Sequence, residues 1–213
     1  MAAHPQEELL GGRLAVDFAN LGRVFSGGSG RVLTWHTLVT FLEAAKVVSP
    51  ERSARLLALP QTDPEAADGL LAVGRRLQTA VHQGFTALAH GERITRESAE
   101  VINEILRVTE GHDELVWDQG QWRMEFVARE SSPEWLLAAI ARSAAEIVAD
   151  SQTARLRSCA NPDCGLLFCD TSRTRKRRWC SMATCGNRHK VAAFARRHAQ
   201  KRPAARSATR SGG

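Results

Sequence analysis

The five cysteines, all between residues 159 and 185, are the side chains whose spacing points most clearly to chemistry. Four residues separate Cys159 from Cys164, and four separate Cys180 from Cys185. A structural zinc ion takes four tetrahedral ligands, and a pair of cysteines in a tight loop presents two thiolates. Turn-forming residues over 161–163 favour such a loop inside the first pair. The spacing therefore predicts one structural Zn²⁺ ion bound by the two pairs.

Cys169 lies outside both pairs, and we expect it to be a spare thiol that does not bind the metal. A competing ligand set combines Cys159, Cys164 and Cys169 with one later residue, and His189 could also substitute for a cysteine. A redox pair is disfavoured because the segment has no Cys-x-x-Cys motif. Disulfides are disfavoured because we expect a reducing compartment.

That compartment is the cytoplasm, as judged from two properties of the sequence. The first 25 residues contain acidic residues and no long apolar stretch, so they do not resemble a secretory signal. No run approaches the roughly 18 consecutive apolar residues of a membrane span. We therefore expect a cytoplasmic protein without membrane contact.

The basic residues of the chain are concentrated in the same part of the sequence as the cysteines. The 213 residues carry a net charge of +6, but residues 151–213 hold 15 Lys or Arg and two acids, a net of +13. Residues 1–150 have a net charge of −7. Such a step in composition predicts separate modules with different partners. We expect an acidic domain over residues 1–150, a basic finger over 151–200 and a disordered basic tail over 201–213.

A small zinc-bound module with this charge is typical of nucleic-acid binding, because phosphates attract Lys and Arg. DNA is the expected partner. RNA is the nearer alternative, although the segment has few aromatic side chains for stacking on bases. An acidic protein surface is another alternative. Catalysis is not expected, because four thiolates leave zinc no position for water. The candidate nucleic-acid contacts are Arg173, Arg175, Lys176, Arg177, Arg178, Asn187, Arg188, Lys190, Arg196 and Arg197.

The elements that position these residues are predicted to be mainly helical. Helix-starting signals occur at Thr34, Ser49-Pro50, Asp63-Pro64, Thr95 and Ser132-Pro133, each followed by apolar residues at helical spacing. Gly69, Gly74 and Gly84 weaken one helix unless they allow close packing, and Gly91 is a predicted stop. Residues 11–18 are predicted to form a short strand or extended segment.

One β-hairpin stands out in the acidic domain. Residues 115–124 alternate apolar and polar side chains around Gln119-Gly120. This register places Trp117 opposite Trp122, and Leu115 opposite Met124. The predicted fold is therefore α+β but mainly helical: a helical domain with a small hairpin, followed by a zinc finger made of a knuckle, a short hairpin and a helix.

Two segments resemble known families. Residues 177–190, which include Cys180, Cys185 and Gly186-Asn187-Arg188, closely resemble the CGNR zinc finger, and residues 159–173 resemble its first half. The segment Gly12 to Asn20 resembles the opening of the ABATE domain, with Val16 and Leu21 replacing its usual Leu and Thr. The resemblance implies that Cys159, Cys164, Cys180 and Cys185 bind zinc and that Cys169 occupies an apolar position. It also implies a stress-related transcription regulator.

The acidic domain is then expected to be a sensor or dimerisation domain, and a homodimer is one candidate assembly. Asp17 and Asn20 interrupt an apolar stretch. They are predicted either to hydrogen-bond to neighbouring backbone or to contact a small-molecule ligand.

Overall fold

The computed structural model describes residues 10–22, 33–108, 111–118, 120–128, 135–150 and 155–201. The chain divides into two compact units, Met1–Cys180 and Ser181–Gly213. Helices predominate in the described residues, beside two small antiparallel sheets, which confirms the predicted α+β, mainly helical class. The division into residues 1–150, 151–200 and 201–213 stays a prediction, and all but the first residue of the expected tail lies outside the described residues.

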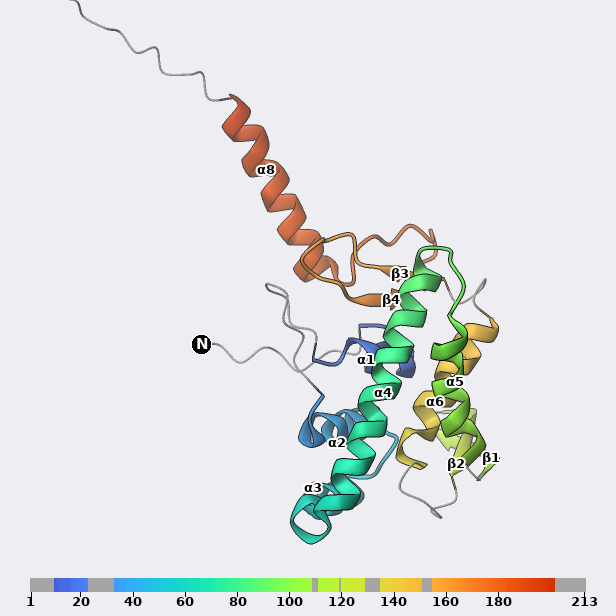
Figure 1. Cartoon of the computed structure of the whole chain (residues 1–213). Coiled ribbons are helices and arrows are strands. Elements are labelled where there is room, and N and C mark those ends of the chain that lie inside the picture. The colour runs from blue at the N-terminus through green and yellow to red at the C-terminus, as the bar shows by residue number, and fades with distance from the viewer. Residues whose placement is uncertain are drawn as a thin grey trace, which may run out of the picture. The chain divides into compact units, whose positions relative to one another are not determined.

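The other helices of the first unit all contact its longest one, α4, which runs along the length of the domain in Figure 1. The core formed in this way is made mainly of aliphatic and phenylalanine side chains, among them Phe18, Leu42 and Phe85. The helices are α1 (Leu14–Asn20), α2 (Trp35–Ala44), α3 (Pro50–Thr62), α4 (Pro64–Ala89), α5 (Arg96–Val108) and α6 (Trp135–Ala149).

Four predicted helix starts are confirmed by their capping hydrogen bonds. In each, the cap side chain accepts a hydrogen bond of 3.0–3.3 Å from the backbone N–H three residues further on. Such bonds satisfy donors that the helix itself leaves unpaired. The caps are Thr34, Ser49, Asp63 and Thr95. The predicted start at Ser132-Pro133 lies outside the described residues.

The predicted extended segment over residues 11–18 is wrong, because helix α1 begins at Leu14. All five residues from Ala15 to Ala19 are buried. The short helix contacts α4, α6 and β4, so it is covered on several sides and shows no amphipathic period. Tertiary packing thus selects helix where the apolar pattern alone suggested an extended chain.

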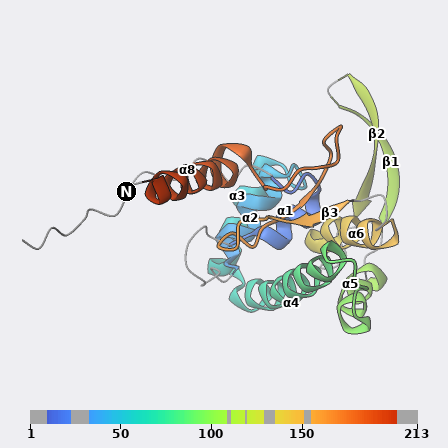
Figure 2. The ribbon, with the colours of Figure 1, turned by 90° about the horizontal axis from the view of Figure 1, so that it is seen from above.

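The predicted hairpin is present. Strands β1 (Gly111–Asp118) and β2 (Gln121–Ala128) pair antiparallel, with Leu115 opposite Met124 and Trp117 opposite Trp122. Gly120 has φ of +83°, a conformation that side-chain-bearing residues rarely adopt and that tight hairpin turns require. Both strands extend beyond the helices of the first unit (Figure 2).

A second hairpin, β3 (Leu156–Ser158) with β4 (Leu167–Cys169), begins the cysteine segment. Leu156, Leu167 and Cys169 are buried in the same hydrophobic core as the helices. The first half of the finger therefore shares its core with the acidic domain.

The second unit contains one π-helical turn, η1 (Met182–Gly186), followed by helix α8 (Asn187–Lys201). Ser181 starts the turn, because its hydroxyl accepts a hydrogen bond from the Thr184 N–H at 3.4 Å. Helix α8 confirms the predicted helical run after the last cysteine. Among the described residues, no helix is both long and apolar enough to cross a membrane.

Candidate metal centre and nucleic-acid interface

The sulfur atoms of Cys159, Cys164, Cys180 and Cys185 all lie within 4.8 Å of one another, and all four residues are buried. The Sγ atoms of Cys164 and Cys180 are 3.6 Å apart. Tetrahedral zinc with Zn–S bonds of about 2.3 Å separates its sulfur ligands by roughly 3.8 Å. The donor set and its spacing therefore fit one structural Zn²⁺ ion, as the two-pair interpretation predicted.

Backbone hydrogen bonds shape the loop that presents the first two sulfurs. The Cys159 N–H donates to the Leu166 carbonyl at 2.8 Å, and the Cys164 N–H donates to the Asn161 carbonyl at 3.0 Å. Gly165 follows with φ of +65°, which lets the chain turn back into β4. The Cys180 N–H also points at the Cys159 sulfur, at 3.5 Å. Such N–H groups favour a thiolate over a thiol.

The proximity of the sulfurs changes their acidity. Hydrogen bonds from the thiols of Cys164 and Cys180 lower the pKa of Cys159 to about 2. The hydrogen bond between Cys164 and Cys159 raises the pKa of Cys164 to about 12, because the Cys164 thiol donates to the Cys159 thiolate. Cys180 likewise has a raised pKa through its contact with Cys159. Zinc ligands must be deprotonated, so metal binding releases these protons.

Cys169 is confirmed as the spare cysteine. Its side chain is 5% exposed and belongs to the hydrophobic core. Its N–H donates to the Gly11 carbonyl at 2.8 Å, which joins β4 to the start of the acidic domain. Burial raises the pKa of this thiol, as expected of a packed, unreactive cysteine.

Asp170 organises the loop that carries the first group of cations. Its carboxylate accepts hydrogen bonds from the Ser172 hydroxyl at 2.6 Å and the Arg177 N–H at 3.0 Å, and it pairs with Arg157 at 3.4 Å. Burial of Asp170 disfavours its charged form, but these hydrogen bonds outweigh burial and lower its pKa. Sequence analysis did not single out Asp170, although it is one of only two acids in residues 151–213.

Arg177 is turned inward, unlike its basic neighbours. Its guanidinium lies 4.4 Å from the centre of the Phe168 ring. Its Nε donates to the Trp179 carbonyl at 2.9 Å, and its Nη2 donates to the Cys180 carbonyl. These contacts give Arg177 a structural role beside a metal ligand. No local sequence signal distinguishes it from the arginines around it.

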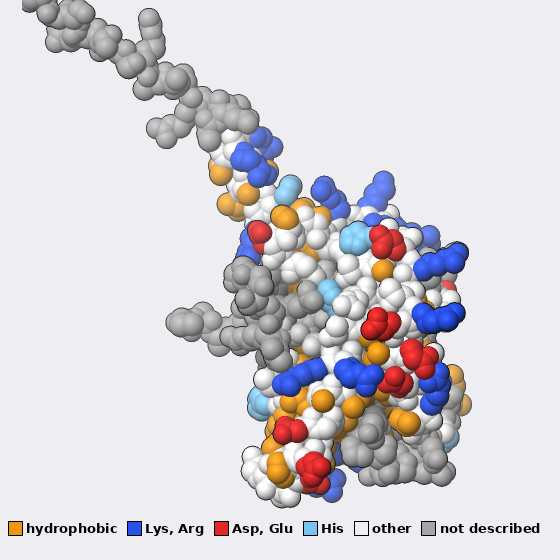
Figure 3. Space-filling view, viewed as in Figure 1, with side chains coloured by type: hydrophobic (Ala, Val, Ile, Leu, Met, Phe, Trp, Pro, Cys, Tyr) orange, Lys and Arg blue, Asp and Glu red, His pale blue; other side chains and the backbone are white. Residues whose placement is uncertain are grey.

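Most other predicted nucleic-acid contacts are exposed. Arg173, Arg175, Lys176 and Arg178 lie in the loop of the first unit. Arg188, Lys190, Arg196 and Arg197 are exposed on α8, whose surface shows blue cationic side chains in Figure 3. Asn187 is also exposed, and its side-chain amide donates to the Ala183 carbonyl at 3.1 Å, so it joins η1 to α8.

Asp17 and Asn20 make hydrogen bonds within the first unit. Asp17 accepts from the Gly11 N–H at 2.6 Å, and burial raises its pKa to about 6. Asn20 bonds to both backbone groups of Leu167, accepting from its N–H at 2.9 Å and donating to its carbonyl at 2.8 Å. The alternative of bonding to backbone is thus realised, and ligand binding by this pair stays a prediction.

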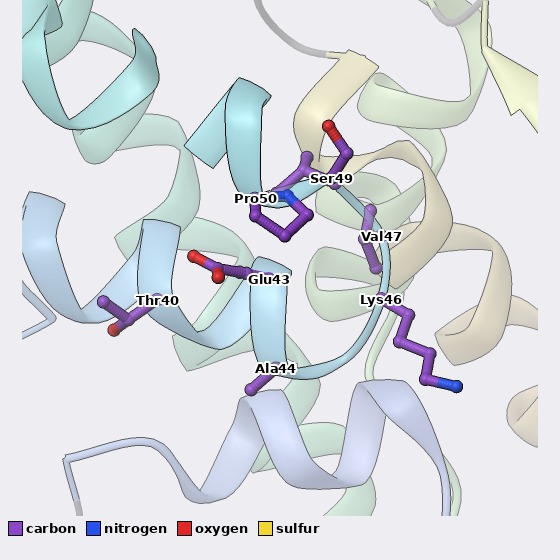
Figure 4. Close-up of a pocket in the computed structure, with 8 residues that line it drawn as sticks. Thr40, Glu43, Ala44, Lys46, Val47, Ser49 and Pro50 are labelled. Atoms are coloured by element: carbon purple, nitrogen blue, oxygen red, sulfur yellow. The ribbon is translucent and has the colours of Figure 1, made fainter. Parts of the chain in front are cut away.

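An open depression lies elsewhere, between the end of α2 and the start of α3 (Figure 4). Its polar lining is provided by Thr40, Glu43, Lys46 and Ser49. Asp17, Asn20 and the cysteines do not line it.

A helical domain that continues into a four-cysteine metal centre with a basic helix defines a zinc-finger protein. Two family models match the chain. Residues 12–151 match ABATE, described as "Putative stress-induced transcription regulator", and residues 155–198 match the CGNR zinc finger. The chain belongs to the ABATE family and carries a CGNR zinc finger at its C-terminal side. No curated protein matches the sequence significantly.

Proposed function

We propose that this protein is a transcription regulator that binds duplex DNA through its zinc finger. The observation that carries the proposal is the set of exposed cations on α8, which begins two residues after the last zinc ligand: Arg188, Lys190, Arg196 and Arg197. Membership of a family of regulators points in the same direction.

The cations of α8 are spread over the helix, which suits contacts with several phosphates better than contact with a single group. Successive helical residues are about 100° apart, so neighbouring Arg196 and Arg197 point in clearly different directions. Lys190 and Arg197, seven residues apart, share one side of the helix. A helix with cations on several sides can contact the backbones that flank a groove.

The metal has a structural role in this proposal. Four thiolates complete a tetrahedral coordination sphere and leave no position for a reactive water molecule. We therefore expect no catalysis at this site. The protein acts in the cytoplasm, where a reducing environment keeps the thiols available for the metal.

A second candidate function is supported by the apolar part of α8. Val191 is 68% exposed and Phe194 is 57% exposed, with the Phe194 ring 4.0 Å from that of His198. Exposed apolar groups beside cations also suit an acidic protein partner. Nuclease treatment before co-purification separates the two functions, because a protein partner survives it and a nucleic acid does not.

The proposal is tested by fluorescence anisotropy with a labelled DNA duplex and the zinc-loaded full chain. The double variant Arg196→Ala/Arg197→Ala should weaken binding. It should also make the slope of the logarithm of affinity against the logarithm of salt concentration less steep by about two, one for each lost phosphate contact. Arg55→Ala/Arg93→Ala removes the same charge from exposed positions of the acidic domain and should leave the slope unchanged. Equal effects of the two double variants would contradict the proposal.

A further inference from the structure

One face of the β1–β2 hairpin exposes four large apolar side chains. Leu115 is 66% exposed, Trp117 58%, Trp122 65% and Met124 68%. The strand register pairs Leu115 with Met124 and Trp117 with Trp122, so the four form two adjacent rows, which we call the apolar ladder. The tryptophan rings already contact each other edge to face, with centroids 5.3 Å apart.

The apolar ladder is large for a surface feature. A buried tryptophan covers about 150–250 Å², so the exposed parts of the two indoles and of Leu115 and Met124 amount to roughly 500 Å². This is near the upper end of the largest apolar patches on monomeric proteins, which are about 300–600 Å² and often functional. A two-stranded hairpin also gains little from exposing such side chains, because it is only marginally stable alone.

The charges of the two strands argue against an anionic partner, because the strands contain four acidic residues and one arginine. His112 and Glu114 alternate with the ladder residues and therefore lie on the other face of the strand. Both are exposed, and they approach each other to 3.9 Å. Phosphates and anionic membranes are recognised by clustered Lys and Arg, which neither of these residues supplies. An apolar protein surface is the matching partner.

We propose that the partner is a second copy of this chain, packed ladder against ladder. Two ladders together bury roughly 1,000 Å², about the minimum of a specific protein interface, so the second copy alone provides sufficient area. The four ladder side chains are uncharged, and twofold symmetry is the commonest way for identical surfaces to associate. The inference does not depend on nucleic-acid binding.

The register specifies how the two hairpins would meet. Rows on one face are two residues apart, roughly 7 Å along the strand, and packed sheets lie about 10 Å apart. A twofold axis midway between the rows and across the strands places the tryptophan pair of each copy over the Leu115–Met124 pair of its partner. Each indole is then covered by aliphatic and thioether groups.

The test is the molar mass of the zinc-loaded full chain, measured by light scattering coupled to size exclusion at about 5–100 µM. We expect twice the 23.3 kDa of one chain. Trp122→Glu should shift the mass to that of a monomer across this range. Met124→Glu, in the other row, should do the same and serves if the first variant does not fold. Circular dichroism establishes that each variant is folded.

The matched control is Glu114→Gln, an exposed position on the neighbouring strand β1 and on the face opposite the ladder, which should keep the dimer mass. If the wild-type protein has the mass of a monomer at the highest concentration, the proposal is overturned. This holds both for a ladder that stays exposed and for one that another part of the same chain covers. A folded Trp122→Glu variant that remains a dimer also overturns it.

Discussion

At the scale of single residues, two polar side chains of α1 help to connect the acidic domain with the cysteine segment. Asn20 pairs with both backbone groups of Leu167, and Asp17 holds Gly11, whose carbonyl accepts from Cys169. Buried backbone groups are costly when unpaired, so such side chains stabilise the junction more than their number suggests.

Replacing Asn20 should reveal this stabilisation. Asn20→Ala removes both hydrogen bonds to Leu167 and leaves its N–H and carbonyl without these partners. The free energy of unfolding should fall by about 2–3 kcal/mol in urea titrations of the zinc-loaded protein. Asn103→Ala, at an exposed position of α5, is the control and should stay within about 0.5 kcal/mol of the wild type. A similar small change for Asn20→Ala would show that the junction does not depend on it.

Asp17 should make stability depend on pH. Its folded-state pKa of about 6 lies above its ordinary value of 3.8, so the folded protein binds this proton more tightly than the unfolded chain does. Stability from the protonated group is therefore fully present below pH 3.8 and is lost as pH rises through about 6. The Asn side chain does not titrate in this range. The wild type should therefore lose stability relative to Asp17→Asn as pH rises from 3.8 to about 6. Urea unfolding at several pH values measures the difference, and a pH-independent difference would refute the assignment.

At the scale of helices and strands, sequence patterns predicted the features that depend on residues close together in the sequence. Helix caps such as Thr34 and Asp63, and the facing tryptophans of the hairpin, follow from local spacing. Helix α1 could not be recognised, because it is buried on several sides and lacks an amphipathic period. The four-cysteine set was predictable because zinc imposes a regular ligand spacing. The inward turn of Arg177 and the pairing of Asn20 with Leu167 depend on long-range folding.

The glycines of α4 offer a matched pair of substitutions. A Cβ added at Gly84 would lie 2.8 Å from the Ile94 Cδ1 atom, closer than real contacts allow, whereas one added at Gly69 would meet nothing within 4 Å. Gly69→Ala should stabilise the protein by up to about 1 kcal/mol through helix propensity. Gly84→Ala should destabilise it by about 1–3 kcal/mol, because the crowding exceeds that gain. Thermal unfolding compares the two, and equal stabilisation by both would disprove close packing at Gly84.

At the scale of the whole molecule, the net charge of +6 is the sum of opposed parts. The acidic first 150 residues carry −7, and the remaining 63 carry +13 around the zinc ligands. The two halves nonetheless share structure, because β3 and β4 contribute Leu156 and Leu167 to the core of the helical domain. Zinc removal should therefore affect the stability of both.

The salt dependence of DNA binding tests the central proposal most directly. The zinc-loaded full chain is titrated into a labelled duplex at several salt concentrations, and the logarithm of affinity is plotted against the logarithm of salt. If the finger neutralises about 6–8 phosphates, the slope should be about −5 to −7. Absence of binding at low salt, or a slope near zero, would contradict duplex DNA as the partner of this basic zinc finger.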